Sequence, residues 1–168
     1  MRLAVTGTPG TGKTTATDLV EPDLDVIHLN EVIKSEDLSS REDAERDTLV
    51  ADMDAVEEWL GDRDDVIVDS HLAHHLPVDK VVVLRCQPAE LERRLTDRGE
   101  SEAKSQENAE SEALDIVLSE AVENHGLDAV YEIDATDRSP ADVAREIERV
   151  LAGEREPSAG EVSYIDYL

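Results

Sequence analysis

Short apolar runs rich in β-branched residues alternate along this chain with longer stretches in which apolar residues recur every three or four positions. A run that is apolar on both faces, such as Val81-Val82-Val83-Leu84, is typical of a parallel strand covered by helices on both sides. The runs predict strands at residues 2–6, 26–29, 66–69, 80–85 and 129–133. Strands separated by helices indicate a doubly wound α/β domain with a parallel sheet.

The stretches between these runs carry the apolar stripes of amphipathic helices. Pro88 and Gly99 are typical of the start and the end of one helix, and Ser139-Pro140-Ala141-Asp142 is similar to the capping box that starts a helix. A long helical segment is expected over residues 102–125. We expect the stripes to lie in the core: Leu49, Met53, Val56 and Leu60; Leu91 and Leu95; Leu114, Val117, Leu118 and Ala121; Val143, Ile147 and Val150.

Residues 7–14 read Gly-Thr-Pro-Gly-Thr-Gly-Lys-Thr, a complete G-x-x-x-x-G-K-[ST] phosphate-binding loop directly after the first strand. Its glycines, among them Gly10 and Gly12, allow backbone angles at which successive N–H groups point at a polyphosphate. Lys13 is expected to reach the β- and γ-phosphates, and the Thr14 hydroxyl to ligate Mg²⁺. A helix that opens at this point adds a dipole that favours anions. The motif predicts nucleoside triphosphate binding.

Carboxylates dominate the composition, because 42 Asp and Glu stand against 16 Lys and Arg and give a net charge of −26. The periodic apolar segments argue against a disordered acidic protein. The composition resembles that of proteins from archaea with molar salt in the cytosol, where a Debye length of about 3 Å screens self-repulsion. An acidic protein of a mesophile is the alternative. The charge disfavours nonspecific nucleic-acid binding and favours a basic protein partner.

A chain of 168 residues is expected to form one domain, here over residues 1–153. The tail at 154–168 docks on the domain, frays or binds a partner, and docking is slightly favoured. We expect a cytoplasmic protein without membrane contact, because no apolar run has spanning length and no signal peptide is recognisable. Cys86 stands alone, which excludes an internal disulfide. Two segments, 35–47 and 98–112, are too polar for the core and are expected to be mobile covers.

The strand at 66–69 is apolar and ends in Asp69, the form of a Walker B element. Such an acid can hold Mg²⁺ or its waters beside the phosphate-binding loop. His71 follows two residues later and is expected to orient a water or a phosphate. An alternative is a zinc site of His71, His74 and His75 with Asp69 as a fourth ligand. Otherwise, His74 and His75 are expected to be structural or exposed to solvent.

Arginines number only twelve, so their positions are informative. Arg94 and Arg98 lie four residues apart on one helical face, where one guanidinium can stack on a base and the other can meet phosphate oxygens. Surface salt bridges to nearby glutamates are the alternative. Arg85 ends the fourth strand at the sheet edge where ligands gather, and Arg41 lies in the first polar segment. Both are expected to contact the phosphate of an acceptor substrate.

Together these residues resemble the archaeal and eukaryotic adenylate-kinase-related family that assists late small-subunit ribosome assembly. The resemblance spans the chain to about residue 151. It rests on residues 7–15 (GTPGTGKTT), 46–56 (RDTLVADMDAV), the Asp69-x-His71 step, 85–99 ending in LTDRG, Glu107-Asn108, and 131–140 (YEIDATDRSP).

The resemblance implies a P-loop NTPase fold with a five-stranded parallel sheet and helices on both faces. It also implies a segment near residues 30–53 that binds nucleoside monophosphate (NMP), and a short lid near 97–107. ATP contacts are implied at Gly10, Gly12, Lys13, Thr14, Thr15 and Arg98. Family members phosphorylate NMPs, hydrolyse ATP and bind a basic small-subunit ribosomal protein during rRNA maturation. Between residues 101 and 115 this chain has only Lys104 as a basic residue, fewer than ordinary adenylate kinases have there, which leaves room for hydrolysis.

The sequence therefore predicts an adenylate-kinase-type ATP:NMP phosphotransferase with ATPase activity, which uses Mg²⁺ and acts in small-subunit maturation. The alternatives are an ATPase switch that binds a basic ribosomal protein, and a kinase of another small acceptor. The expected roles are catalytic for Lys13, Asp69, His71 and Arg98; nucleotide-binding for Gly10, Gly12, Lys13, Thr14, Thr15, Arg94 and Arg98; acceptor-binding for Arg41 and Arg85; and metal-binding for Thr14 and Asp69.

Overall fold

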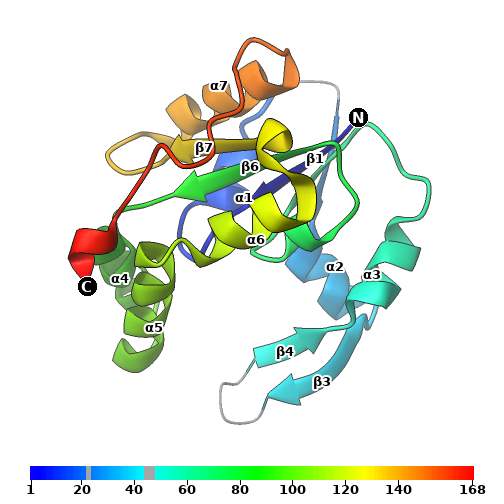
Figure 1. Cartoon of the computed structure of the whole chain (residues 1–168). Coiled ribbons are helices and arrows are strands. Elements are labelled where there is room, and N and C mark those ends of the chain that lie inside the picture. The colour runs from blue at the N-terminus through cyan, green and yellow to red at the C-terminus, as the bar shows by residue number, and fades with distance from the viewer. Residues whose placement is uncertain (22–23, 44–47) are drawn as a thin grey trace.

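A computed structural model describes residues 1–21, 24–43 and 48–168, and the side chains of residues 40–49 lie outside this description. Five parallel strands form the central sheet in the order β2-β5-β1-β6-β7 (Figure 1). The strands are β1 Arg2–Thr6, β2 Asp25–His28, β5 Val66–Asp69, β6 Lys80–Arg85 and β7 Val130–Asp134. Each end lies within one residue of its expected position, so the parallel sheet is confirmed.

Helices cover both faces of this sheet, which confirms the α/β architecture. They are α1 Lys13–Thr17, α2 Leu29–Ser35, α3 Met53–Leu60, α4 Pro88–Asp97, α5 Glu102–Ala113, α6 Ile116–His125 and α7 Pro140–Leu151, with 3₁₀ turns η1 Ala73–His75, η2 Leu127–Ala129 and η3 Ile165–Tyr167. Successive residues of a strand point to opposite faces. Leu3 and Val5 of β1 therefore share one core cluster with α1 and α7, while Ala4 shares the other with α2, α3 and α6.

The starts of α7 and α4 lie where the capping serine and the proline predicted them, but the boundary between α5 and α6 was not predicted. Ser139 caps α7 by accepting a hydrogen bond from the Asp142 N–H at 3.1 Å, and Pro88 is the first residue of α4. The expectation of one long helical segment over 102–125 is wrong, because α5 ends and α6 begins around Asp115. This residue adopts a left-handed φ of 57°, which an Asp tolerates better than most residues.

The first polar segment forms a small antiparallel hairpin that the sequence did not indicate. Strand β3 Ser39–Asp43 pairs with β4 Thr48–Ala51. The hairpin is anchored at its base, where the Asp52 N–H donates to the Leu38 carbonyl at 2.8 Å. Figure 1 shows it extending away from the central sheet beside α2 and α3. The sequence of β3, SSRED, is polar throughout, so no alternating apolar pattern predicted this strand. Leu49 belongs to β4 and not to the helical stripe expected for it.

The C-terminal tail docks along β7 and reaches the helices that follow β6. The Ser158 N–H donates to the Val130 carbonyl at 3.0 Å, in the manner of an added backbone partner for the strand. Further along, the Tyr164 hydroxyl donates to Asp134 Oδ2 at 2.6 Å, and the Tyr167 hydroxyl donates to Glu92 Oε2 in α4 at 2.7 Å. In Figure 1 the red end of the chain accordingly lies beside α4 and α5.

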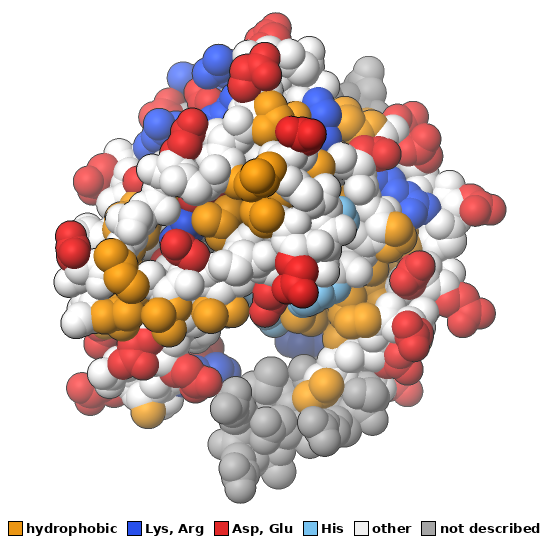
Figure 2. All heavy atoms as spheres, viewed as in Figure 1, with side chains coloured by type: hydrophobic (Ala, Val, Ile, Leu, Met, Phe, Trp, Pro, Cys, Tyr) orange, Lys and Arg blue, Asp and Glu red, His pale blue; other side chains and the backbone are white. Residues whose placement is uncertain are grey.

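Acidic side chains are scattered over the face shown in Figure 2, with few basic ones between them. The same view is hollowed near its lower centre, with histidine side chains at the upper rim of the hollow. None of the helices in the described ranges combines the length and the apolar content that a membrane span requires.

Candidate nucleotide site

The phosphate-binding loop, residues 7–14, follows the central strand of the sheet and packs tightly on α4. At Gly10 the φ is +93°, and an added Cβ would lie 2.9 Å from Leu91 Cδ1 and 3.0 Å from Leu95 Cδ2. Only glycine combines this backbone conformation with this close approach. Inside the loop, the Thr11 hydroxyl donates to the Thr8 carbonyl at 2.9 Å. The loop is therefore preformed by packing and by its own hydrogen bonds.

The Lys13 side chain folds back over the loop that precedes it. Its Nζ donates to the Gly7 carbonyl at 2.9 Å and to the Thr8 carbonyl at 3.1 Å. Burial lowers the pKa of this ammonium to about 8, against the opposing effect of Asp69. Thr14 and Thr15 are exposed at the start of α1, as contacts with a bound phosphate require.

Two features of the loop fit a polyphosphate. The Thr8 hydroxyl is buried and has no hydrogen-bond partner within the described residues, which leaves a polar group to be satisfied. The Lys13 ammonium donates only to uncharged oxygens of the loop, as far as the described residues show. A bound anion would improve both environments. The residues expected to hold ATP thus have suitable chemistry in this structure.

Asp69 ends β5 at the carboxyl edge of the sheet, level with Val5 on one side and His28 on the other. Only 4% of its surface is exposed. Its Oδ2 accepts from the Thr17 hydroxyl at 2.5 Å and lies 2.7 Å from His28 Nδ1. The acid expected to serve Mg²⁺ is therefore held in place by Thr17 of α1 and by His28, whereas Thr14 has no hydrogen bond to it.

His28 is a residue that the sequence reasoning missed. Its second ring nitrogen lies 2.9 Å from Asp18 Oδ1, so the imidazole bridges Asp18 and Asp69. Burial by itself lowers the pKa of His28, but the two carboxylates outweigh burial and raise it. Its place at the carboxyl end of β2, next to the strand that carries Asp69, is the signal that would have found it.

A cavity of about 880 Å³ adjoins the loop at Thr8 and Pro9 and corresponds to the hollow in Figure 2. Its far walls come from α2, which contributes Lys34, and from α5, which contributes Lys104. Sequence reasoning had not assigned a phosphate-binding role to either lysine. Three glutamates, Glu100, Glu107 and Glu120, line the same cavity. Lys34, Lys104 and Arg98 therefore offer individual contacts for anions rather than a net positive charge.

His71 lies in the wall of this cavity, two residues beyond Asp69. Burial, together with the nearby positive charge of Lys13, lowers the pKa of its imidazole to about 4. The ring is therefore neutral at neutral pH. A neutral imidazole can accept a hydrogen bond from a water or hydroxyl in the cavity.

Arg94 and Arg98, expected as a pair, have different environments. Arg94 donates to Glu90 Oε1 at 3.1 Å and, through a long contact of 3.4 Å, to the Gly10 carbonyl, so it combines the surface salt bridge with contact to the loop. Arg98 follows α4, is exposed and lines the cavity. It makes no ion pair within the described parts of the chain.

Arg85 is buried in the core and does not reach the cavity. Its donors are taken by Glu112 at 2.8 Å, Glu132 at 2.8 Å and Asp115 at 2.6 Å, and its side chain is fully buried. These carboxylates raise the pKa of Arg85 further, despite burial. The expectation that it binds an acceptor phosphate is therefore corrected: its charge is already compensated. The side chain of Arg41 lies outside the described residues.

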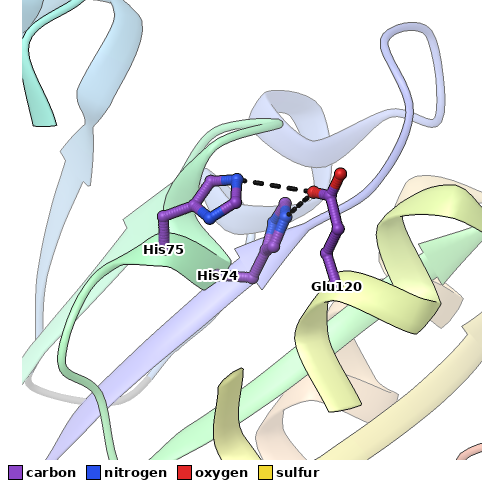
Figure 3. Close-up of side chains that lie close together, drawn as sticks. All are labelled: His74, His75 and Glu120. Atoms are coloured by element: carbon purple, nitrogen blue, oxygen red, sulfur yellow. Dashed lines mark hydrogen bonds and ion pairs between the residues drawn. The ribbon is translucent and has the colours of Figure 1, made fainter. Parts of the chain in front are cut away.

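The histidines do not assemble with Asp69 as the zinc alternative required. His74 and His75 instead lie beside Glu120 of α6, as Figure 3 shows. His74 is 1% exposed, and burial lowers its pKa. Among the described residues this is the one group of three or more His, Cys, Asp or Glu side chains close enough to share an ion.

Comparison with known proteins places the chain in a family. Residues 3–115 match a family described as an AAA domain. Proteins named "Putative adenylate kinase" are similar over the whole chain: one from Natronomonas pharaonis is 61% identical over all of both chains, and one from Methanocaldococcus jannaschii is 35% identical over all of this chain and 97% of its own. The chain belongs to this adenylate-kinase-related family. A family member from Methanosarcina acetivorans is 43% identical over 90% of this chain and 86% of its own.

Solved structures agree on the fold of this family member. Shikimate kinase from Bacteroides thetaiotaomicron superposes with a TM-score of 0.57 at 18% identity, covering 91% of this chain and 98% of its own. A sulfotransferase from Alicyclobacillus acidocaldarius gives 0.58 at 15% identity, over 98% and 86% of the two chains. With the sheet order described above, the expected P-loop NTPase fold is confirmed.

Proposed function

We propose that the protein transfers the γ-phosphoryl group of ATP to a nucleoside monophosphate, the reaction of an adenylate kinase. One observation carries the proposal: a single cavity extends from the phosphate-binding loop to two lysines on the opposite walls. The transfer needs two phosphate-bearing substrates held end to end, and such a cavity offers anion-binding groups at both ends. The names of its archaeal relatives support the same reaction.

The roles follow from the positions of the side chains. Lys13 and the loop amides would hold the β- and γ-phosphates, and Arg98 at the cavity wall would neutralise charge on the group in transfer. Thr14 and Asp69 would hold Mg²⁺, which supplies charge compensation on the phosphates. The protein contributes positioning and electrostatic stabilisation, because phosphoryl transfer asks for little covalent chemistry from it.

The acceptor phosphate requires a partner other than Arg85. Lys34 in α2 and Lys104 in α5 line the cavity away from the loop and are our candidates. Within the described residues, Lys104 pairs with Glu100 at 3.4 Å. Both side chains are partly exposed, so this ion pair is weak and easy to exchange for a phosphate. Arg41 stays a prediction for the same role.

A comparison of lysine variants tests this proposal, because the chain has only four lysines. In molar KCl with Mg-ATP, Lys13→Ala should abolish ADP formation. Lys34→Gln and Lys104→Gln should raise KM for the NMP about tenfold or more, with KM for ATP nearly unchanged. Lys80→Gln is the matched control, because Lys80 donates to the Val150 carbonyl and lines no part of the cavity. Unchanged NMP kinetics in both cavity variants would refute the acceptor site.

ATP hydrolysis without an acceptor is a second candidate activity, and the neutral imidazole of His71 favours it. From the cavity wall this ring can orient an attacking water. His71→Ala should therefore lower ATP hydrolysis more than AMP phosphorylation. If both rates fall equally, or neither falls, His71 has no separate role in hydrolysis.

The family resemblance predicts a basic small-subunit ribosomal protein as a partner, and the charge of this chain supports that prediction. A net charge of −26 favours association with a basic surface at low salt. ADP formation should be measured without an acceptor, with each NMP, and with a basic ribosomal protein. If only the ribosomal protein stimulates ADP formation, and no NMP does, the kinase proposal would be replaced by that of an ATPase assembly switch.

A further inference from the structure

A second group of side chains lies at the edge of the nucleotide cavity, where η1 meets α6. Glu120 Oε2 lies 2.7 Å from His74 Nε2 and 3.4 Å from His75 Nε2, and the three ligand atoms are all within 4.8 Å of one another (Figure 3). Two imidazole nitrogens with one carboxylate are a donor set that suits zinc and its neighbours better than Mg²⁺. We propose that His74, His75 and Glu120 bind a divalent transition metal of the zinc class.

The distances of the two imidazole nitrogens from Glu120 are close to those that a metal needs. Zinc lies about 2.0–2.2 Å from nitrogen and oxygen ligands, which separates tetrahedral donors by roughly 3.3 Å. The His75–Glu120 pair already has this spacing, while the His74–Glu120 pair would open by roughly half an ångström. Glu120 is 41% exposed, so its carboxylate can move by this amount without disturbing the core.

The buried histidine is oriented as a metal ligand would be. His74 Nδ1 lies 2.7 Å from the Thr6 hydroxyl on the central strand, so the ring is fixed and its Nε2 points outward at Glu120. Metal-binding histidines generally use their second nitrogen in such a hydrogen bond. A simple histidine–glutamate hydrogen bond would need only one imidazole. Here the His75 ring lies 4.2 Å from the His74 ring and faces the same oxygen.

The site would keep one coordination position open. It has three protein ligands, and two of them, His75 and Glu120, also line the nucleotide cavity. Zinc sites with three protein ligands bind a water or a ligand oxygen in the fourth position. A metal here would face molecules that enter the cavity. This inference does not depend on the identity of the acceptor, because it rests only on the arrangement of His74, His75 and Glu120.

Cobalt titration of the full-length protein tests the proposal directly. The protein is stripped with EDTA in molar KCl and then titrated with Co²⁺, whose visible absorption is strong in a four- or five-coordinate site. We expect saturation at one Co²⁺ per chain, displacement by Zn²⁺, and no displacement by excess Mg²⁺. Failure to saturate at one ion per chain, or displacement by Mg²⁺, would overturn the proposal.

Two ligand variants and one control test the assignment of the ligands. His75→Gln and Glu120→Gln change partly exposed side chains, so both proteins should fold, and each should weaken Zn²⁺ binding at least about tenfold and abolish the Co²⁺ absorption. His125→Gln is the control: His125 donates to the His74 carbonyl but is not among the proposed ligands, and Zn²⁺ affinity should stay the same. Equal affinity in wild type, His75→Gln and Glu120→Gln would show binding by surface carboxylates instead and would refute the site.

Discussion

Arg85 and Arg98 were both expected to neutralise phosphate charge, yet the structure gives them opposite environments. Arg85 ends β6 in the core, fully buried among Glu112, Asp115 and Glu132. Arg98 follows α4, is exposed, and lines the cavity beside the phosphate-binding loop without an ion pair in the described parts of the chain. One arginine ties elements of the fold together, and the other is available to a ligand.

The difference arises from what packs over each residue. The tail lies across the end of β6, with the Val162 carbonyl 3.4 Å from an Arg85 nitrogen and the Tyr164 ring 5.8 Å from its guanidinium. The Gly160 and Glu161 N–H groups donate to Glu132, which holds this carboxylate against Arg85. A position at the carboxyl edge of a sheet therefore indicates a ligand site only if no other segment covers it.

The largest effect should follow from removal of the buried charge. Arg85→Met leaves Glu112 and Glu132 buried without their cation and should lower the free energy of unfolding by about 3–5 kcal/mol. Urea unfolding followed by circular dichroism measures it. Adding Glu112→Gln should recover part of the loss, since it removes one stranded charge. Arg93→Met is the control, because its ion pairs with Glu90 and Asp97 are exposed and its stability should match wild type.

Arg98→Ala should lower activity and leave stability unchanged, the converse of the stability loss in Arg85→Met. The loss of one preorganised charge near the transferred group should lower kcat about 10²–10³-fold. Urea unfolding should remain at the wild-type midpoint, because Arg98 makes no ion pair in the described residues. Arg93→Ala is the control and should leave kcat unchanged, because Arg93 pairs with Glu90 and Asp97 of its own helix. A stability loss in Arg98→Ala would remove the distinction between the two arginines.

The pH dependence of ATP affinity reports on Lys13. Its pKa in the free protein is lowered to about 8, so the ammonium that meets the phosphates is lost as the pH rises through that value. ATP affinity should be nearly constant below pH 8 and fall by up to about tenfold per pH unit above it. Lys13→Arg should flatten the curve, because a guanidinium stays charged. Calorimetric titrations on both sides of pH 8 measure it.

Docking of the tail can be weakened at one hydroxyl. Tyr164→Phe removes the hydrogen bond to Asp134 Oδ2 and should lower the free energy of unfolding by about 1 kcal/mol, since the site is partly exposed. Tyr131→Phe is the matched control, because the Tyr131 hydroxyl has no hydrogen bond within the described ranges. Equal stability of both variants would mean that the hydroxyl of Tyr164 does not help to hold the tail over Arg85.

The smallest expected effect concerns salt. The stability of the wild-type protein should rise with KCl, because a net charge of −26 repels itself less when screened. The stability lost in Arg85→Met should change little between low and molar KCl, because a buried ion pair is poorly screened. Urea unfolding of both proteins across a KCl series gives the comparison. If the stability difference between wild type and Arg85→Met disappears in molar KCl, the Arg85 ion pairs are screened and therefore accessible to solvent.

Features that depend on neighbouring residues were predictable. The five strands, the loop at 7–14 and the cap at Ser139 were read from short stretches, because strand periodicity, glycine conformations and capping hydrogen bonds act within a few residues. Lys34 and Lys104 were missed as cavity residues for the opposite reason. They come together from α2 and α5, which are far apart in the chain, and neither has a local pattern that marks it.

The sequence by itself determined that this protein has a parallel α/β sheet with a P-loop after its first strand, since strand periodicity and the loop motif are both local patterns of a few residues. Only the tertiary structure decided which charged side chains face the cavity and which are buried. Arg85 meets Glu112 and Glu132 across 27 and 47 residues of chain, and no periodicity records such pairs. Burial, charge compensation and access to a ligand depend on contacts between residues that are far apart in the chain.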